Sequence, residues 1–157
     1  AGGVAQMGRA GAWSLVVDED GDRRAALQLR TWSGPSRVWA SATAIALDRN
    51  PGDLLGGGDR QQQAHREAEQ IIALACERIG LPRPVHVEVS FRPPWVGGAK
   101  VDRNHPPFPR RDDRVRRVQV HARVEFDQQV RGPVLLGAGR YLGLGLMRPV
   151  APERRKR

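Results

Sequence analysis

The stretch GPVLLGAGRYLGLGLMRP, residues 132–149, decides how the rest of the chain is read. Five glycines fall within fourteen residues, and Leu and Val fill the gaps where a flexible linker would have Ser or other polar residues. After Arg140, the leucines at 142, 144 and 146 alternate with small residues, which predicts a strand with one apolar face and one nearly bare backbone face. Bare backbone lets a ligand or another chain segment approach closely.

The turn before this predicted strand, residues 137–140, places backbone N–H groups beside the cation of Arg140. Such a turn can bind a phosphate group. Glycines in a strand can equally form a bulge or a tight crossing of chain segments, so both interpretations stay open here. The glycines precede a strand instead of following one, and no Gly-Lys-Ser or Gly-Lys-Thr is present, so the nucleotide-cofactor fingerprints fit poorly.

The charge of the chain is unevenly distributed. The 157 residues are enough for one domain with a core, and the formal net charge is +9. Residues 101–157 hold 14 Arg or Lys against 6 Asp or Glu, so most of the excess lies in the last third. Of the 26 basic residues 24 are Arg, whose planar fork suits nucleic acid. A GC-rich genome also replaces Lys with Arg, so the uneven distribution of charge is a stronger indication of a nucleic-acid partner than the Arg content.

Several classes of protein are excluded by composition. The single Cys76 allows no internal disulfide and no cysteine-based metal site. No apolar run approaches the roughly twenty residues of a membrane span, and no secretory signal is visible. We therefore expect a cytoplasmic protein with no membrane contact, no cysteine-based metal site and no cofactor. The chain starts at Ala1 with no initiator methionine, as expected of a piece of a longer protein.

The remaining patterns predict an α+β protein. The clearest element is a helix over 59–79, with an apolar stripe at helical spacing, a capping-box spacing at Asp59 and Gln62, and stop signals at Gly80 and Pro82. The other expected elements are a flexible lead-in at 1–12, short strands at 13–17 and 25–31, a strong strand at 38–47, a half-buried strand at 85–91, an irregular loop at 92–114, a basic strand at 118–126, a helical turn at 131–136 and a disordered basic tail at 150–157.

The order strand, helix, strand, strand, connector, strand is close to the ferredoxin-like, RRM-like βαββαβ pattern, with an open antiparallel sheet and the glycine-rich loop before the last strand. We expect a lead-in with one extra strand at 1–27, the ferredoxin-like domain at 28–149 and the tail at 150–157. A fold of this kind does not by itself settle function.

The run from Arg131 to Leu146 resembles the C-terminal glycine-rich motif of the repeat-associated Cas proteins, which are the CRISPR RNA-processing endoribonucleases and their backbone-subunit relatives. Similar stretches lie at 30–32, 43–49, 79–82 and 106–111. Together they resemble the C-terminal half of the fused backbone-and-processing subunit of a type I CRISPR effector of the U/G subtype. Typical members have two ferredoxin-like halves and this chain has room for about one, so the other half is expected on another chain or outside this sequence.

This resemblance implies binding of CRISPR repeat RNA, partnership with other subunits of a type I effector complex, and metal-independent cleavage through attack of a ribose 2′-hydroxyl on the neighbouring phosphate. Such chemistry needs a base, an acid and cations, and His is the usual acid or base near neutral pH. We rank His121 first, on the open polar face of the basic strand, then His105 in the long loop and His65 near the helix start. His86 is interpreted as structural.

The resemblance also implies RNA-binding residues. The motif glycines would let the RNA backbone approach, Arg140 is the first expected phosphate contact, and four other arginines would extend a basic track. These residues are Gly137, Gly139, Gly143, Gly145, Arg140, Arg110, Arg111, Arg117 and Arg123. Two other hypotheses stay open at this point: a non-catalytic RNA-binding subunit of a CRISPR ribonucleoprotein, and a protein-interaction module whose arginines reflect genome composition.

Overall fold

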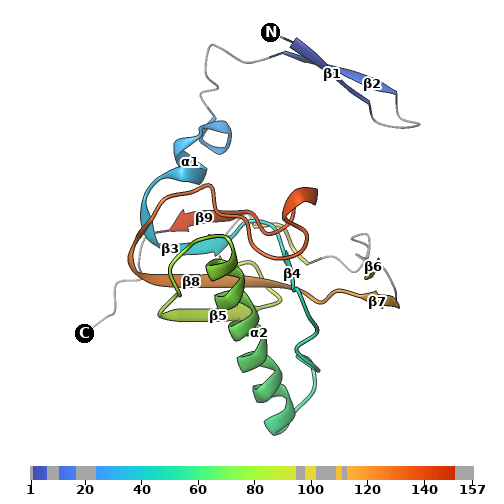
Figure 1. Cartoon of the computed structure of the whole chain (residues 1–157), viewed down its shortest axis with the longest axis vertical. Coiled ribbons are helices and arrows are strands. Elements are labelled where there is room, and N and C mark those ends of the chain that lie inside the picture. Colours follow the sequence, from blue (N-terminus) through green and yellow to red (C-terminus); the bar gives the residue numbers. More distant parts are fainter. Residues whose placement is uncertain are drawn as a thin grey trace. The chain divides into compact units, whose positions relative to one another are not determined.

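The computed structural model describes residues 2–6, 11–16, 24–94, 98–101, 109–110 and 113–150. The chain divides into two compact units, Ala1–Thr31 and Trp32–Arg157 (Figure 1). We describe each unit by itself.

The first unit contains an antiparallel hairpin of β1 (Gly2–Gln6) and β2 (Ala12–Val16), with Gly2 opposite Val16. The predicted flexible lead-in over 1–12 is therefore wrong at β1. The predicted strand over 25–31 is also wrong, because Ala25–Leu27 forms a 3₁₀ turn, η2, and the short helix α1 begins at Arg30 and ends at Ser33. The Thr31 hydroxyl donates to the carbonyl of Ala25, which curls this segment where the alternating pattern predicted extension.

The second unit is built on a five-stranded antiparallel sheet. Its strands are β3 (Ser36–Ser41), β4 (Ile45–Ala46), β5 (His86–Ser90), β8 (Gln119–Val130) and β9 (Met147–Val150). The long strand β8 is central, and its residue Arg123 pairs with Glu88 of β5 on one side and Ala40 of β3 on the other. Strand β4 pairs with the start of β8, and β9 pairs with β3. The protein is thus an α+β protein with an open antiparallel sheet.

The predicted strand over 38–47 is present but interrupted. Residues 42–44 separate β3 from β4, because the backbone N–H groups of Ala42 and Thr43 both point to the Leu146 carbonyl instead of continuing the ladder with β8. Alanines at 42, 44 and 46 are buried here, and their small size lets a later part of the chain come close.

Helix α2 (Gly58–Arg78) confirms the predicted helix to within a residue at each end. Its N-cap is Gly57 with no side-chain cap, so the predicted capping box is wrong; the Asp59 carboxylate instead favours the first turn by its charge. The end at Gly80 is confirmed: Gly80 has φ +83°, and the N–H groups of Gly80 and Leu81 donate to the Glu77 and Cys76 carbonyls.

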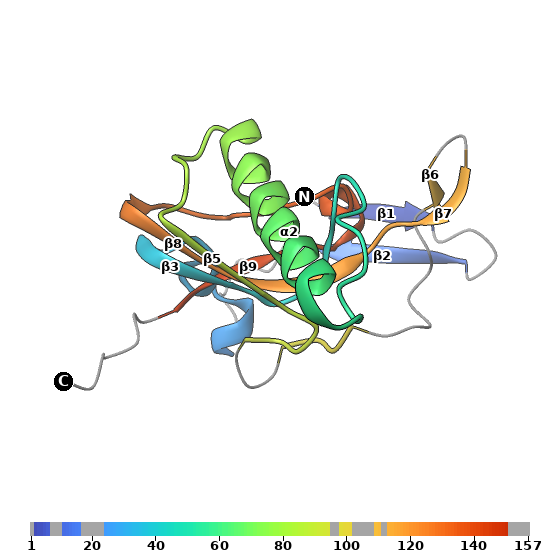
Figure 2. The same ribbon diagram turned by 90° about the horizontal axis from the view of Figure 1, so that it is seen from below.

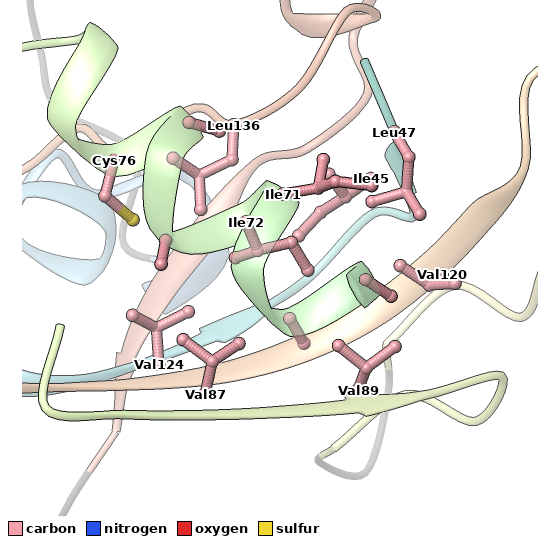
Figure 3. Close-up of a cluster of buried hydrophobic side chains, with 14 of the residues drawn as sticks. Ile45, Leu47, Ile71, Ile72, Cys76, Val87, Val89, Val120, Val124 and Leu136 are labelled. Atoms are coloured by element: carbon pink, nitrogen blue, oxygen red, sulfur yellow. The ribbon is translucent and has the colours of Figure 1, made fainter. Parts of the chain in front are cut away.

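The apolar stripe of α2 packs against one face of the sheet, and this packing forms the hydrophobic core (Figures 2 and 3). The core side chains shown in Figure 3 are Ile71, Ile72 and Cys76 from α2, Val87 and Val89 from β5, Val120 and Val124 from β8, Ile45 and Leu47 at β4, and Leu136. Even-numbered residues of β8 supply this face, so its odd-numbered residues belong to the opposite face of the sheet.

The region after β8 differs from the predictions. No helical turn forms at 131–136, where Leu135 makes an isolated bridge to Leu146. The predicted strand through Leu142 and Leu144 is wrong as well, because a 3₁₀ turn, η3 (Arg140–Leu142), precedes β9. Gly137, with φ +82°, turns the chain within the predicted turn, whereas Gly143 and Gly145, with φ +82° and +71°, turn it where extended backbone was expected.

The expected irregular loop over 92–114 contains a small antiparallel ribbon of β6 (Pro109–Arg110) and β7 (Asp113–Arg116). The other parts of that loop, at 95–97, 102–108 and 111–112, and the tail at 151–157 lie outside the described residues. Among the helices that the structure describes, none has the length and apolar character needed to cross a membrane.

Candidate nucleic-acid interface

The glycine-rich loop, residues 132–146, is fastened along β4 by backbone hydrogen bonds. The Ala138 N–H donates to the Ala46 carbonyl at 2.9 Å on one arm of the loop, and the Gly145 N–H donates to the Ala44 carbonyl at 2.8 Å on the other. The Leu136 N–H closes the base of the loop by donating to the Gly145 carbonyl at 3.0 Å. Both arms of the loop are therefore held by the same short segment, which consists of β4 and Ala44 just before it.

Three of the four predicted glycines are packed against the chain itself. A Cβ atom would lie 2.4 Å from the Ala46 carbonyl oxygen at Gly137, 2.8 Å from the Leu144 side chain at Gly139, and 1.9 Å from the Leu136 carbonyl oxygen at Gly145. The bare backbone at these positions serves the loop's own packing. At Gly143 a Cβ would meet nothing within 4 Å, so there only the positive φ of +82° favours glycine. Contact of these glycines with RNA stays a prediction.

The loop tip, Arg140–Leu142, carries a cation and two exposed residues, Tyr141 and Leu142. An Arg140 Nη1 group donates to the Gly137 carbonyl at 3.2 Å, and the guanidinium carbon lies 4.6 Å from the centroid of the Tyr141 ring. The Tyr141 side chain is nevertheless 84% exposed, and Leu142 is 67% exposed. A stacked guanidinium and an exposed aromatic ring are groups that bind phosphates and stack on bases.

The other predicted basic residues have varied surroundings. Arg117 donates to the backbone carbonyls of Leu47 and Asp48, and Arg123 is only 16% exposed and lies 3.7 Å from the Glu125 carboxylate. Both guanidinium groups thus have partners within the protein. Arg110 lies in β6, and Arg111 falls outside the described residues. Arg140 lies at the loop tip, and the guanidinium groups of Arg117 and Arg123 are engaged elsewhere.

His121 does not lie on an open face, and the predicted exposure is wrong. Its ring is fully buried, Nδ1 lies 2.8 Å from Ser41 Oγ, and Nε2 has no hydrogen-bond partner among the described groups. The same Ser41 oxygen accepts the Ala122 N–H at 3.0 Å, so its hydroxyl proton can be donated to Nδ1. Burial lowers the pKa of His121, and backbone groups of Ala99 and Ser41 offset part of that lowering.

The segment 98–101 contributes to the surroundings of His121. The Ala99 N–H donates to the Ala42 carbonyl at 2.9 Å, which fixes this segment against the break between β3 and β4. With its lowered pKa, His121 stays neutral at physiological pH. Through Ser41 it links β8 to β3. The ring reaches a bound RNA only after the chain around it moves.

The remaining histidines are dispersed. His65 is half-buried in the second turn of α2, and α2 covers the sheet face opposite to the odd-numbered residues of β8, so His65 and His121 do not form an acid–base pair. His86 is exposed on β5, opposite Glu125, and His105 lies outside the described residues. Among the residues that the structure describes, no group of three His, Cys, Asp or Glu could hold a metal ion.

Two features of this region were missed by sequence reasoning. Ser41 was not singled out, although a Ser within an otherwise apolar strand is a signal for a buried hydrogen bond. The exposed loop tip was hidden because Leu142 was assigned to the apolar face of a strand.

The sequence model of the CRISPR-associated protein, GSU0054 family (Cas_GSU0054), matches residues 16–149. The chain belongs to this family. The match spans the whole sheet, α2 and the glycine-rich loop, and it confirms the predicted link to CRISPR-associated proteins across most of the chain. No curated protein and no solved structure matches the chain.

Proposed function

We propose that this protein binds CRISPR repeat RNA through its loop tip, as an RNA-holding subunit of a type I CRISPR ribonucleoprotein complex. The observation that carries the proposal is the loop tip itself: an arginine stacked on an exposed tyrosine, held on a loop whose arms are fastened to Ala44 and Ala46. Residues 128–150 contain three arginines and no acidic residue, so the tip presents positive charge to a polyanion.

The sheet supports the same proposal. Its strands follow the order β5, β8, β3, β9, all antiparallel, and α2 connects β4 to β5 across one face. We infer a ferredoxin-like arrangement in which the glycine-rich loop takes the place of the second helix. The family membership supports CRISPR RNA as the ligand class.

Cleavage of the bound RNA without metal is the second proposal, and one observation favours it. Ala42 accepts a hydrogen bond from Ala99 and donates one to the Leu146 carbonyl, so residue 99 of the long loop that carries His105 lies close to the end of the glycine-rich loop. Within this proposal His105 ranks above His121, which is buried, and His65, which lies on α2. General acid–base chemistry would require a second group to complete the site.

The test is incubation of the full chain with end-labelled repeat RNA of the associated CRISPR array in EDTA, over a range of salt concentrations. Binding that weakens steeply with salt, and weakens further in Arg140→Ala, is the expected result. Arg60→Ala is the matched control, because Arg60 is an exposed arginine in the first turn of α2. Binding that is insensitive to salt and to Arg140→Ala would overturn the proposal.

The same reaction tests cleavage. A product formed by the wild-type chain and lost in His105→Ala supports the processing nuclease. A product that persists in His105→Ala but is lost in His65→Ala or His121→Asn moves the site to that histidine. Tight binding without a product identifies an RNA-holding subunit.

A further inference from the structure

The high exposure of the Tyr141 ring is not explained by any packing role in the loop. The ring is 84% exposed, whereas the neighbouring Leu144, three residues later, is buried under the loop. One face of the ring meets the Arg140 guanidinium, and the exposed fraction leaves the other face open to solvent. An aromatic ring held in water and already stacked on one side is available for a flat partner on the other.

The ring is presented on a constrained turn. The N–H groups of Leu142 and Leu144 both donate to the Gly139 carbonyl, at 2.8 and 3.2 Å, and Gly143 ends the turn in the left-handed conformation. Buried Leu144 fixes the C-terminal side of the turn, and the Arg140 bond to Gly137 fixes the N-terminal side. Such fixation lowers the entropy that a partner's binding must overcome.

We propose that Tyr141 stacks on one unpaired base of the bound RNA, so that Arg140, Tyr141 and the base form three parallel layers. The proposal rests on the RNA-binding function proposed above and names the part of the RNA that this tip contacts. An unpaired nucleotide fits better than a protein surface, because the stack carries a full positive charge beside the ring and residues 128–150 have no acidic side chain. Every base has a flat π-face and an adjoining phosphate, which matches both groups of the tip.

The test combines abasic substitution along the repeat RNA with three variants of the full chain. Wild type is expected to lose about tenfold or more in affinity at one unpaired position when its base is removed, and Tyr141→Ala is expected to lose a similar factor with the intact RNA. With the abasic RNA, Tyr141→Ala should cause no further loss, because the two changes remove the same contact. Tyr141→Phe keeps the ring and should bind as wild type does.

A fluorescent base gives an independent readout. Repeat RNA with 2-aminopurine at that position should be quenched on binding to wild type and to Tyr141→Phe, and should stay bright with Tyr141→Ala. Leu55→Ala is the matched control, because Leu55 is also an exposed leucine but lies outside the loop tip; it should quench the probe as wild type does. Circular dichroism of each variant verifies folding.

The outcomes separate the two proposals. If Arg140→Ala weakens a salt-dependent interaction while Tyr141→Ala binds every RNA as wild type does, the RNA-binding function stands and base stacking is overturned. The same conclusion follows if Tyr141→Phe behaves like Tyr141→Ala, because the hydroxyl and not the ring would then be responsible. If wild type binds no RNA at low salt, both proposals fail, and the tip is a contact for a protein subunit.

Discussion

Ser41 Oγ lies 2.8 Å from Nδ1 of His121, and the two residues are 80 positions apart in the sequence. The same oxygen accepts the Ala122 N–H, just where the ladder between β3 and β8 stops at the Ala40–Arg123 pair. The Ser41 hydroxyl group therefore links β3 to β8 beyond the last residue pair of the ladder. The pair is buried, so its hydrogen bonds cannot be replaced by bulk water.

Removal of this hydroxyl should destabilise the protein. We expect Ser41→Ala to lower the free energy of unfolding by about 1–3 kcal/mol, because the Ala122 N–H and His121 Nδ1 are left buried without that partner. Urea denaturation followed by circular dichroism measures the change. Ser90→Ala is the control, since Ser90 Oγ accepts only the exposed Arg92 N–H at the end of edge strand β5. Equal stabilities of the two variants would contradict the structural role of Ser41.

His121 should make stability depend on pH. Its folded-state pKa lies below the ordinary 6.5, so the unfolded chain binds a proton more readily than the folded one. The stabilisation is present above pH 6.5 and is lost as the pH falls through the folded-state pKa. Urea denaturation at pH 7.5 and pH 5 should show a larger loss for wild type than for His121→Asn, whose amide oxygen can still accept from Ser41.

The matched variant for this pH experiment is His86→Asn, which removes an exposed histidine from edge strand β5. It should keep the wild-type difference between the two pH values. A His121→Asn protein that loses as much stability as wild type between pH 7.5 and pH 5 would show that another group carries the dependence.

Substitutions at two glycines of the glycine-rich loop should cost different amounts of stability, although the two have similar backbone conformations. Gly143→Ala adds a side chain at φ +82° in open space and should cost about 1 kcal/mol of unfolding free energy. Gly145→Ala, at φ +71°, also drives a Cβ to 1.9 Å from the Leu136 carbonyl oxygen and should cost roughly 3 kcal/mol or more. Thermal and urea denaturation of both variants measure the difference. Equal losses of unfolding free energy would mean that the backbone around Leu136 moves to relieve the close contact.

The thiol group of Cys76 should be unreactive in the folded protein. Its side chain is fully buried on α2, and burial raises the pKa of the thiol to about 12, so almost none of it is thiolate at pH 8. We expect no reaction with Ellman's reagent in native buffer and stoichiometric reaction in urea above the unfolding transition. Rapid labelling in native buffer would show that α2 separates readily from the sheet.

The elements with a clear period could be predicted from the sequence. The stripe of α2 and the alternation of β5 and β8 each place apolar residues on one face, and these faces meet in the core. β8 extends to Val130, beyond the predicted end at 126, because exposed polar residues at 127–129 hide the continuing strand. The interruption at 42–44 depends on Leu146, a contact between distant parts of the chain that no local pattern reveals.

The candidate site was harder to predict for two physical reasons. Alternating Leu and Gly fits a strand, but the positive φ values of Gly143 and Gly145 turn the same residues into a loop. The polarity of His121 placed it correctly on the face opposite α2, but nothing local indicated that Ser41 and the segment 98–101 cover that position. The role of Arg140 in phosphate binding stays a prediction, and the exposure of its neighbour Tyr141 required the fold.

The hydrogen bonds that attach the glycine-rich loop are separate from the residues at its tip. Its two arms are joined to Ala44 and Ala46 through backbone groups only, and the three residues of the tip take no part in those bonds. A change of side chains at the tip therefore leaves the hydrogen bonds that attach the loop in place. Grafting another three-residue sequence between Gly139 and Gly143 should leave the melting temperature nearly unchanged, and under the proposed RNA-binding function it should alter which nucleotides are preferred.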